Sequence, residues 1–222
     1  MLKKVLISLG IILVASGLMV GILFAIKQAQ PQPETEESSE VEADPTKTVA
    51  DLSKDYGACT LLTVEFIKTT LGDSAKDLQE PQNMGIVNEN NVGPGVEGIV
   101  SDSHTCAYPF VLGGAIEDGF NNGNGLNVQV TMYQSSDDAI AMSTQIRESG
   151  MAESIDGLGD AAFYTYSDDE RGLSEPTNTF KLQVFKDQKL TSLTLRQPTE
   201  TSAFNAETGR DVLVKLAEQA DQ

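Results

Sequence analysis

The residue types best suited to chemistry in this chain are a single histidine, His104, and two cysteines, Cys59 and Cys106. His104 and Cys106 are two positions apart, so on a β-strand their side chains would share one face. A thiolate beside an imidazole is a nucleophile–base pair, but that chemistry requires a free sulfur with a lowered pKa. Two cysteines in an oxidising compartment instead predict a disulfide. We therefore favour a Cys59–Cys106 bridge, worth about 4 kcal/mol in the chain-entropy model.

A hydrolase that uses His104 with a nearby carboxylate or serine is the alternative hypothesis. Ser101, Asp102 and Ser103 precede the histidine directly. Adjacency in sequence is not the arrangement that a catalytic triad needs, because its members converge from distant elements. The sequence therefore assigns no catalytic residue, and it leaves the presence of any enzymatic activity undecided.

The acidic residues do not form a recognisable metal or cofactor motif. The triplet 168–170 stands beside Arg171, but its spacing fits no EF-hand loop, so a solvated turn is the preferred interpretation. Glu117 and Asp118 are adjacent, and neighbouring side chains on an extended chain point apart. A zinc site wants three or four ligands, and no glycine-rich phosphate loop occurs. We expect no metal and no cofactor.

The N-terminus decides where these residues lie. Residues 5–26 carry no charged side chain and are bracketed by Lys3, Lys4 and Lys27. At about 1.5 Å per residue the run spans roughly 33 Å, enough to cross a hydrocarbon core. The run is longer than a signal-peptide core, and no convincing cleavage site follows. The pattern predicts an uncleaved signal-anchor, with residues 1–4 in the cytoplasm and the rest of the chain outside the cell membrane.

The segment after the span is a predicted tether. Residues 27–50 contain three prolines, a cluster of glutamates and few large apolar side chains to bury, so we expect an extended, disordered linker. The chain as a whole carries 33 acidic against 15 basic residues, for a net charge of −18. Such a surface repels nucleic acid.

The remaining residues, 51–222, amount to one domain. Thr63 is a predicted helix N-cap, Gly72 ends that helix, and Ser135 caps a second one. Residues 73–103 are rich in Asn, Gly and Pro and predict an irregular loop. Period-two alternation predicts strands at 104–112, 126–133, about 161–167, around 180–184 and around 193–195, and helical spacing predicts a last helix over 203–220.

This order of elements, α-β-β-α-β-β-β-α, predicts an α+β domain with a mostly antiparallel sheet packed by helices. The strands at 104–112 and 126–133 are expected to pair antiparallel.

Three motifs together resemble a known family. They are the helix start ACTLLTVEFIKTTLG with Cys59, the segment HTCAYPF with Cys106, and the turn GLGDAAF at 157–163. The combination is similar to a domain family of unknown function found in exported lipoproteins of high-GC Gram-positive bacteria. The likeness covers roughly residues 55–220. It implies a Cys59–Cys106 bridge and a sandwich related to the PsbP-like fold, and it implies no activity. This chain lacks the lipidation cysteine, so a protein span would replace the lipid anchor.

The function expected from these features is a membrane-anchored extracytoplasmic module of the bacterial cell envelope. It would bind or interact without catalysis. Its partner would be an envelope protein or a cell-wall component, and nucleic acid is not expected. The alternative is an anchored extracytoplasmic hydrolase that uses His104. The ligand, the oligomeric state and the envelope type of the host do not follow from the sequence.

Overall fold

The computed structural model describes residues 55–91, 95–110, 116–117, 120–121, 124–169 and 176–221. The predicted span 5–26 and the predicted tether 27–50 lie outside these residues. Within the described part of the chain, no helix is both long and apolar enough to cross a membrane.

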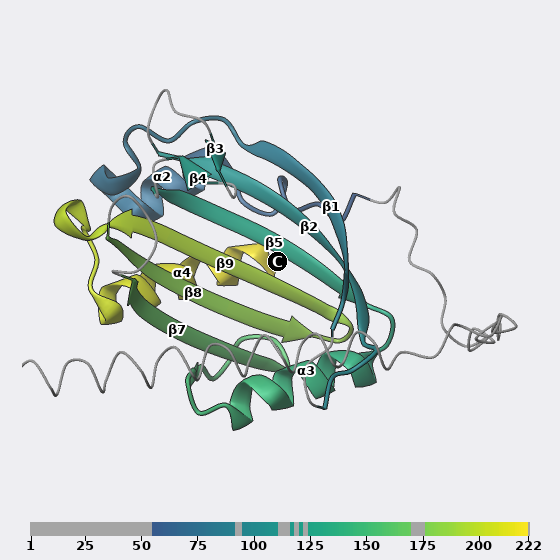
Figure 1. The fold of residues 1–222 in the computed structure, drawn as a ribbon. Helices are drawn as coiled ribbons and strands as arrows, with labels where there is room; N and C mark the ends of the chain where they lie inside the picture. The colour runs from purple at the N-terminus through teal and green to yellow at the C-terminus, as the bar shows by residue number, and fades with distance from the viewer. Residues whose placement is uncertain are drawn as a thin grey trace, which may run out of the picture. The chain divides into compact units, whose positions relative to one another are not determined.

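The main feature is a seven-stranded sheet in which each pair of neighbouring strands is antiparallel. Its order is β1-β2-β5-β9-β8-β7-β6, as Figure 1 shows for the long strands. The bounds are β1 Gln82–Asn90, β2 Val100–Pro109, β5 Gly125–Tyr133, β9 Lys189–Pro198, β8 Thr177–Lys186, β7 Ala161–Asp169 and β6 Glu153–Ser154. A separate pair joins β3 Ile116–Glu117 to β4 Phe120–Asn121. The mostly antiparallel α+β architecture is confirmed.

Two helices pack on one face of this sheet. They are α2, Val64–Leu71, and α4, Ala206–Ala220, which lies behind the sheet in Figure 1. Alternate apolar side chains of the long strands pack against these two helices and form one core. The sheet contributes Tyr108, Leu126, Val128, Phe180, Leu182, Leu193 and Leu195, and the helices contribute Ile67, Leu71, Leu213 and Leu216.

The third helix, α3, Ser136–Glu148, lies at one end of the opposite face. A second and smaller core forms there around Tyr133, Phe163, Phe185 and Leu190, which point away from α2 and α4 by strand alternation. The ring centroids of Tyr133 and Phe185 are 6.4 Å apart in a stacked arrangement. The rest of this face has no described helix over it in Figure 1.

The predicted helix caps are present. The Thr63 hydroxyl accepts a hydrogen bond from the Phe66 N–H at 3.2 Å, and Gly72 follows α2 with a φ of 59°. Ser135 caps α3 by accepting from the Asp138 N–H at 3.1 Å. The last helix begins three residues later than predicted, because Asn205 is its N-cap.

The prediction of an irregular loop over 73–103 was wrong. A short 3₁₀ helix spans Gly72–Ala75, β1 fills Gln82–Asn90, and β2 starts at Val100 rather than at His104. β1 is mostly exposed, including its apolar Met84 and Val87, so buried and exposed positions do not alternate along it. Its backbone pairing with β2 holds it in place, and that is a long-range interaction that local composition does not reveal.

The GLGD turn has a structural role. The Asp160 N–H donates to the Phe185 carbonyl, and the Asp160 carboxylate accepts from the Asp187 N–H, both at 2.7 Å. Gly159 has a φ of 54°, and a Cβ there would clash with the same Phe185 carbonyl. The turn therefore fixes the start of β7 against the β8–β9 hairpin, and glycine is required for the close approach.

Candidate functional site

The two cysteines are joined. Cys59 and Cys106 form a disulfide across a sequence separation of 47, as predicted. It links the segment before α2 to β2, the strand next to the edge strand β1. The Tyr108 hydroxyl supports the same junction by donating to the carbonyls of Leu62 at 3.0 Å and Cys59 at 3.3 Å. The sulfur of Cys106 is therefore not available as the nucleophile of a Cys–His pair.

His104 is buried inside this junction, with 1% of its surface exposed. Its Nδ1 lies 3.0 Å from the Asp55 carboxylate and 3.3 Å from the Ala58 backbone nitrogen. Its Nε2 lies 3.0 Å from the Asn83 side-chain oxygen. Both ring nitrogens are engaged, so the imidazole connects three separate segments of the chain: the residues before α2, β1 and β2.

The serines and the aspartate next to His104 in sequence do not converge on it. Asp102 accepts from Asn88 at 2.8 Å and from the Tyr56 hydroxyl at 3.2 Å. The Ser103 hydroxyl points to the other face and shares a hydrogen bond of 2.8 Å with Thr131. A carboxylate does lie within reach of Nδ1, as a hydrolase would need, but Nε2 faces an amide rather than a nucleophile. This geometry supports a structural role for His104.

The acidic candidates are placed only in part. Asp168 lies on β7 and is exposed. Glu170, Arg171 and Asp118 lie outside the described residues, and so does the side chain of Glu117. Among the residues that the structure does describe, no group of three or more His, Cys, Asp or Glu side chains is placed to hold a metal ion.

A different surface has the features of a binding site. We define the open face as the side of the large sheet opposite α2 and α4, apart from the end that α3 covers. Its side chains are almost all polar. The polar ones are Glu89 of β1, Ser103 and Thr105 of β2, Asn127, Gln129 and Thr131 of β5, Ser192, Thr194 and Arg196 of β9, Thr177, Thr179, Lys181 and Gln183 of β8, and Thr165 and Ser167 of β7, while Val87 of β1 and Ala107 of β2 are apolar.

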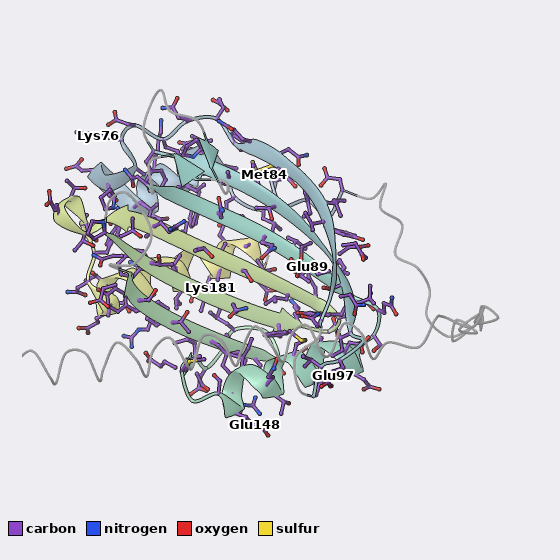
Figure 2. The ribbon with its side chains drawn as sticks, viewed as in Figure 1. Lys76, Met84, Glu89, Glu97, Glu148 and Lys181 are labelled. Atoms are coloured by element: carbon purple, nitrogen blue, oxygen red, sulfur yellow. A yellow bond between two sulfur atoms is a disulfide. The ribbon has the colours of Figure 1, made fainter. Side chains whose placement is uncertain are left out.

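Two cations lie next to each other on the open face. Lys181 of β8 pairs with Thr194 of β9, while Arg196 of β9 pairs with Thr179 of β8. Lys181 and Arg196 are therefore diagonal neighbours, with Cβ atoms roughly 7–8 Å apart in such a geometry. Figure 2 labels Lys181 on this face of the sheet. Paired cations are unexpected in a chain with a net charge of −18.

Lys181 is partly buried. Burial lowers the pKa of its ammonium group from the usual value, and the Glu89 carboxylate acts in the opposite direction. In the described part of the chain, no carboxylate lies within 4 Å of this ammonium group. A partly desolvated cation without a close counter-ion costs folding free energy, and such groups concentrate at functional sites.

Two buried hydrogen-bonding atoms lie beside Arg196. The Oγ1 atom of Thr177, a residue with 1% exposure, and the Oδ1 atom of Asn127 have no hydrogen-bond partner among the residues that the structure describes. Register places each of them diagonally next to Arg196, on β8 and on β5. Unsatisfied buried polar atoms are uncommon in folded proteins and each requires an explanation. We name these four residues, Lys181, Arg196, Thr177 and Asn127, the cationic cluster.

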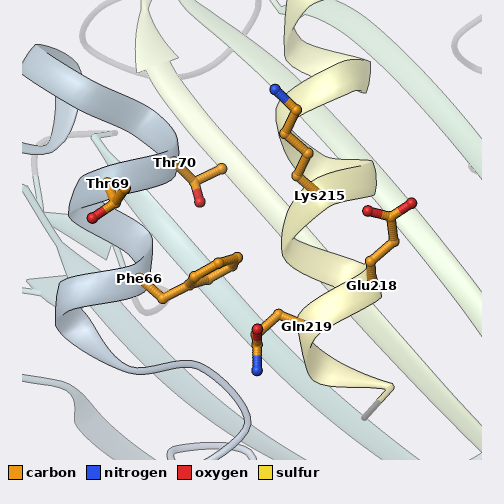
Figure 3. A pocket seen from close by; sticks show the side chains of 6 residues that line it. All are labelled: Phe66, Thr69, Thr70, Lys215, Glu218 and Gln219. Atoms are coloured by element: carbon orange, nitrogen blue, oxygen red, sulfur yellow. The ribbon is translucent and has the colours of Figure 1, made fainter.

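A groove also opens on the opposite side of the molecule, between α2 and α4. Its volume is about 460 Å³, and Figure 3 shows the Phe66 ring extending from α2 toward α4 beside Gln219. Thr69, Thr70, Lys215 and Glu218 complete its lining. Most of these side chains are exposed, and the groove contains both a cation, Lys215, and a carboxylate, Glu218. Substitutions in this groove therefore serve as controls for substitutions on the open face.

Comparisons with known proteins give a distant likeness and no family. No protein-family model and no curated protein matches the sequence. The extracellular domain of PknH from Mycobacterium tuberculosis is similar at 8% identity, with a TM-score of 0.40, over 77% of this chain and 98% of that one. An uncharacterised protein from Mycobacterium smegmatis is similar at 9% identity, with a TM-score of 0.27, over 76% of this chain and 100% of that one. Likenesses this remote carry no functional argument.

Proposed function

We propose that this chain is an extracytoplasmic binding module of a bacterial cell envelope, and that it binds its partner through the open face. Residues 5–26 would hold it in the membrane with residues 1–4 in the cytoplasm, and residues 27–50 would extend the domain away from the bilayer. The partner is an envelope protein or a cell-wall component. The observation that carries the proposal is the partly buried Lys181 cation on a polar sheet face without a described helix over it.

The disulfide supports the location. Structural disulfides persist in oxidising compartments and are rare in the reducing cytosol. The Cys59–Cys106 bond joins well-packed elements, because Cys106 is fully buried in the main core. An N-terminal apolar run and a stabilising disulfide together fit a domain that folds outside the membrane. Membership of the exported lipoprotein family named above belongs to this proposal too, on the strength of the three motifs.

The open face supports binding over catalysis. One face of an antiparallel sheet commonly contacts water, so polar side chains alone would mean little. The cationic cluster is different, because Lys181 is partly desolvated and the buried Thr177 hydroxyl has no partner in the described part of the chain. A partner that supplied negative charge and hydrogen bonds would relieve both costs.

The test is envelope binding by the full-length chain in detergent or nanodiscs. Purified cell-wall and membrane fractions are sedimented with the wild type, with Lys181→Glu on the open face and with Lys215→Glu in the α2–α4 groove. Both variants change charge equally. We expect Lys181→Glu to lose most of the binding and Lys215→Glu to retain it. Equal retention by all three proteins, or no binding by the wild type, would overturn the proposal.

A further inference from the structure

We infer that the cationic cluster binds an anionic polyol, meaning a hydroxyl-rich unit of an envelope glycopolymer that carries a carboxylate or phosphate group. This inference rests on the proposed function and adds the chemical class of the ligand. It follows from the charge, the hydrogen-bonding capacity and the side chains of one small area of the sheet.

The charge of the site selects an anion. Lys181 and Arg196 are diagonal neighbours on two adjacent strands, so two cationic side chains lie close together here. The rest of the chain is strongly acidic, so an anionic ligand would be repelled by most of the surface and attracted here. Glu89 acts on Lys181 but lies beyond ion-pair distance, so among the described residues no carboxylate pairs with the ammonium group.

The unpaired atoms select hydroxyl groups. The Asn127 side-chain oxygen can only accept a hydrogen bond, while the Thr177 hydroxyl can donate or accept. Sulfate carries no O–H group near neutral pH and cannot satisfy Asn127, and inorganic phosphate offers only the O–H groups of one small ion. A polyol offers O–H donors as well as acceptors, and an attached carboxylate or phosphate group would reach the cations. The combination of the two features therefore distinguishes an anionic polyol from a simple ion.

Aromatic stacking would contribute little to ligand binding at the cationic cluster, because of the side chains that surround it. The aromatic residues that the structure describes on this face of the sheet, Tyr133, Phe163 and Phe185, belong to the core that α3 covers. Around the cations the side chains are threonines and amides, including Thr179, Thr194 and Gln129. Recognition would then depend on charge and hydrogen bonds, so the affinity should fall steeply as salt is added.

The experiment is calorimetric titration of the full-length chain in nanodiscs with four defined probes. They are a uronic-acid oligosaccharide, a polyol-phosphate oligomer, a neutral oligosaccharide of matched length and inorganic phosphate. We expect at least one of the two anionic polyols to bind about tenfold more tightly than both the neutral sugar and inorganic phosphate. Whichever binds identifies the source of the negative charge. Equal binding of neutral and anionic oligomers, or preference for bare phosphate, would overturn the inference.

Variants assign the binding to the cluster. Lys181→Gln and the near-isosteric Asn127→Asp should each weaken the anionic polyol about tenfold or more, and Lys215→Gln in the α2–α4 groove should leave it unchanged. Thermal melts confirm that each variant folds. If the envelope fractions bind through the open face while none of the four probes binds, the ligand class is wrong and the proposed function stands. If neither binds, both are wrong.

Discussion

Removing the disulfide should lower the free energy of unfolding by about 4 kcal/mol. The bond closes a loop with a sequence separation of 47, and in the chain-entropy model such a closure restricts the denatured chain by about that amount. Native contacts at the junction should survive, because the Tyr108 hydroxyl and His104 hold the same segments together independently of the sulfurs. The loss therefore comes mainly from the denatured state.

For a domain of this size, each kcal/mol shifts the melting temperature by roughly 2–4 °C, so the midpoint should fall by about 8–16 °C. The assay is urea and thermal unfolding of the oxidised wild type, the reduced wild type and a Cys59→Ala/Cys106→Ala double variant. The reduced wild type is the control for packing, because it keeps both sulfur atoms in the core. A loss below about 1 kcal/mol in both reduced and substituted proteins would refute the reasoning.

Three further outcomes are expected. Gly209→Ala should destabilise the domain by about 1–3 kcal/mol, because the new Cβ would overlap the Phe180 ring beneath α4, and urea unfolding against exposed-site alanine controls measures this. Burial raises the pKa of Tyr108 to about 12, above an unfolded value near 10. Its neutral hydroxyl therefore contributes about 2–3 kcal/mol to the free energy of unfolding, which is complete below pH 10 and is lost as the pH rises through 12. Burial raises the pKa of Tyr133 and Tyr164 in the same way, so the contribution of Tyr108 is measured as the difference in unfolding free energy between the wild type and Tyr108→Phe from pH 9 to 12. Lys181→Gln should raise the melting temperature at pH 7 while Lys215→Gln does not, because burial disfavours the charged form of Lys181 in the folded state. An unchanged or lower midpoint for Lys181→Gln would contradict that reading.

Local sequence signals identified the elements whose pattern is local. Thr63 and Ser135 cap helices as their residue types predict, and the alternation of Leu126, Val128 and Val130 marks a strand with one buried face. The sequence also predicted the antiparallel pairing of this strand with the strand through His104, and it predicted the disulfide.

Features that depend on pairing between segments far apart in the chain could not be predicted from the sequence. Buried and exposed positions do not alternate along β1, which is held by β2. The partners of His104, Asp55 and Asn83, come from two other segments, so the sequence could not show that the imidazole is enclosed.

The cationic cluster was missed for a related reason. Lys181 and Arg196 each occupy an outward position on a strand, where a charged residue is unremarkable. Only the register of β8 against β9 brings them together, and only the neighbouring β5 adds Asn127. A signal was available in the sequence, since cations are scarce in this chain and these two alternate with buried residues on successive strands.

The most direct test of the account is photo-crosslinking in intact cells. A photoreactive residue is placed at Gln183 on the open face, and, in a matched protein, at Glu218 on α4 on the other side of the sheet. We predict an envelope adduct that contains carbohydrate from the Gln183 position and little from Glu218. Equal adducts at both positions, or none at Gln183, would contradict the claim that this face of an extracytoplasmic domain holds the ligand.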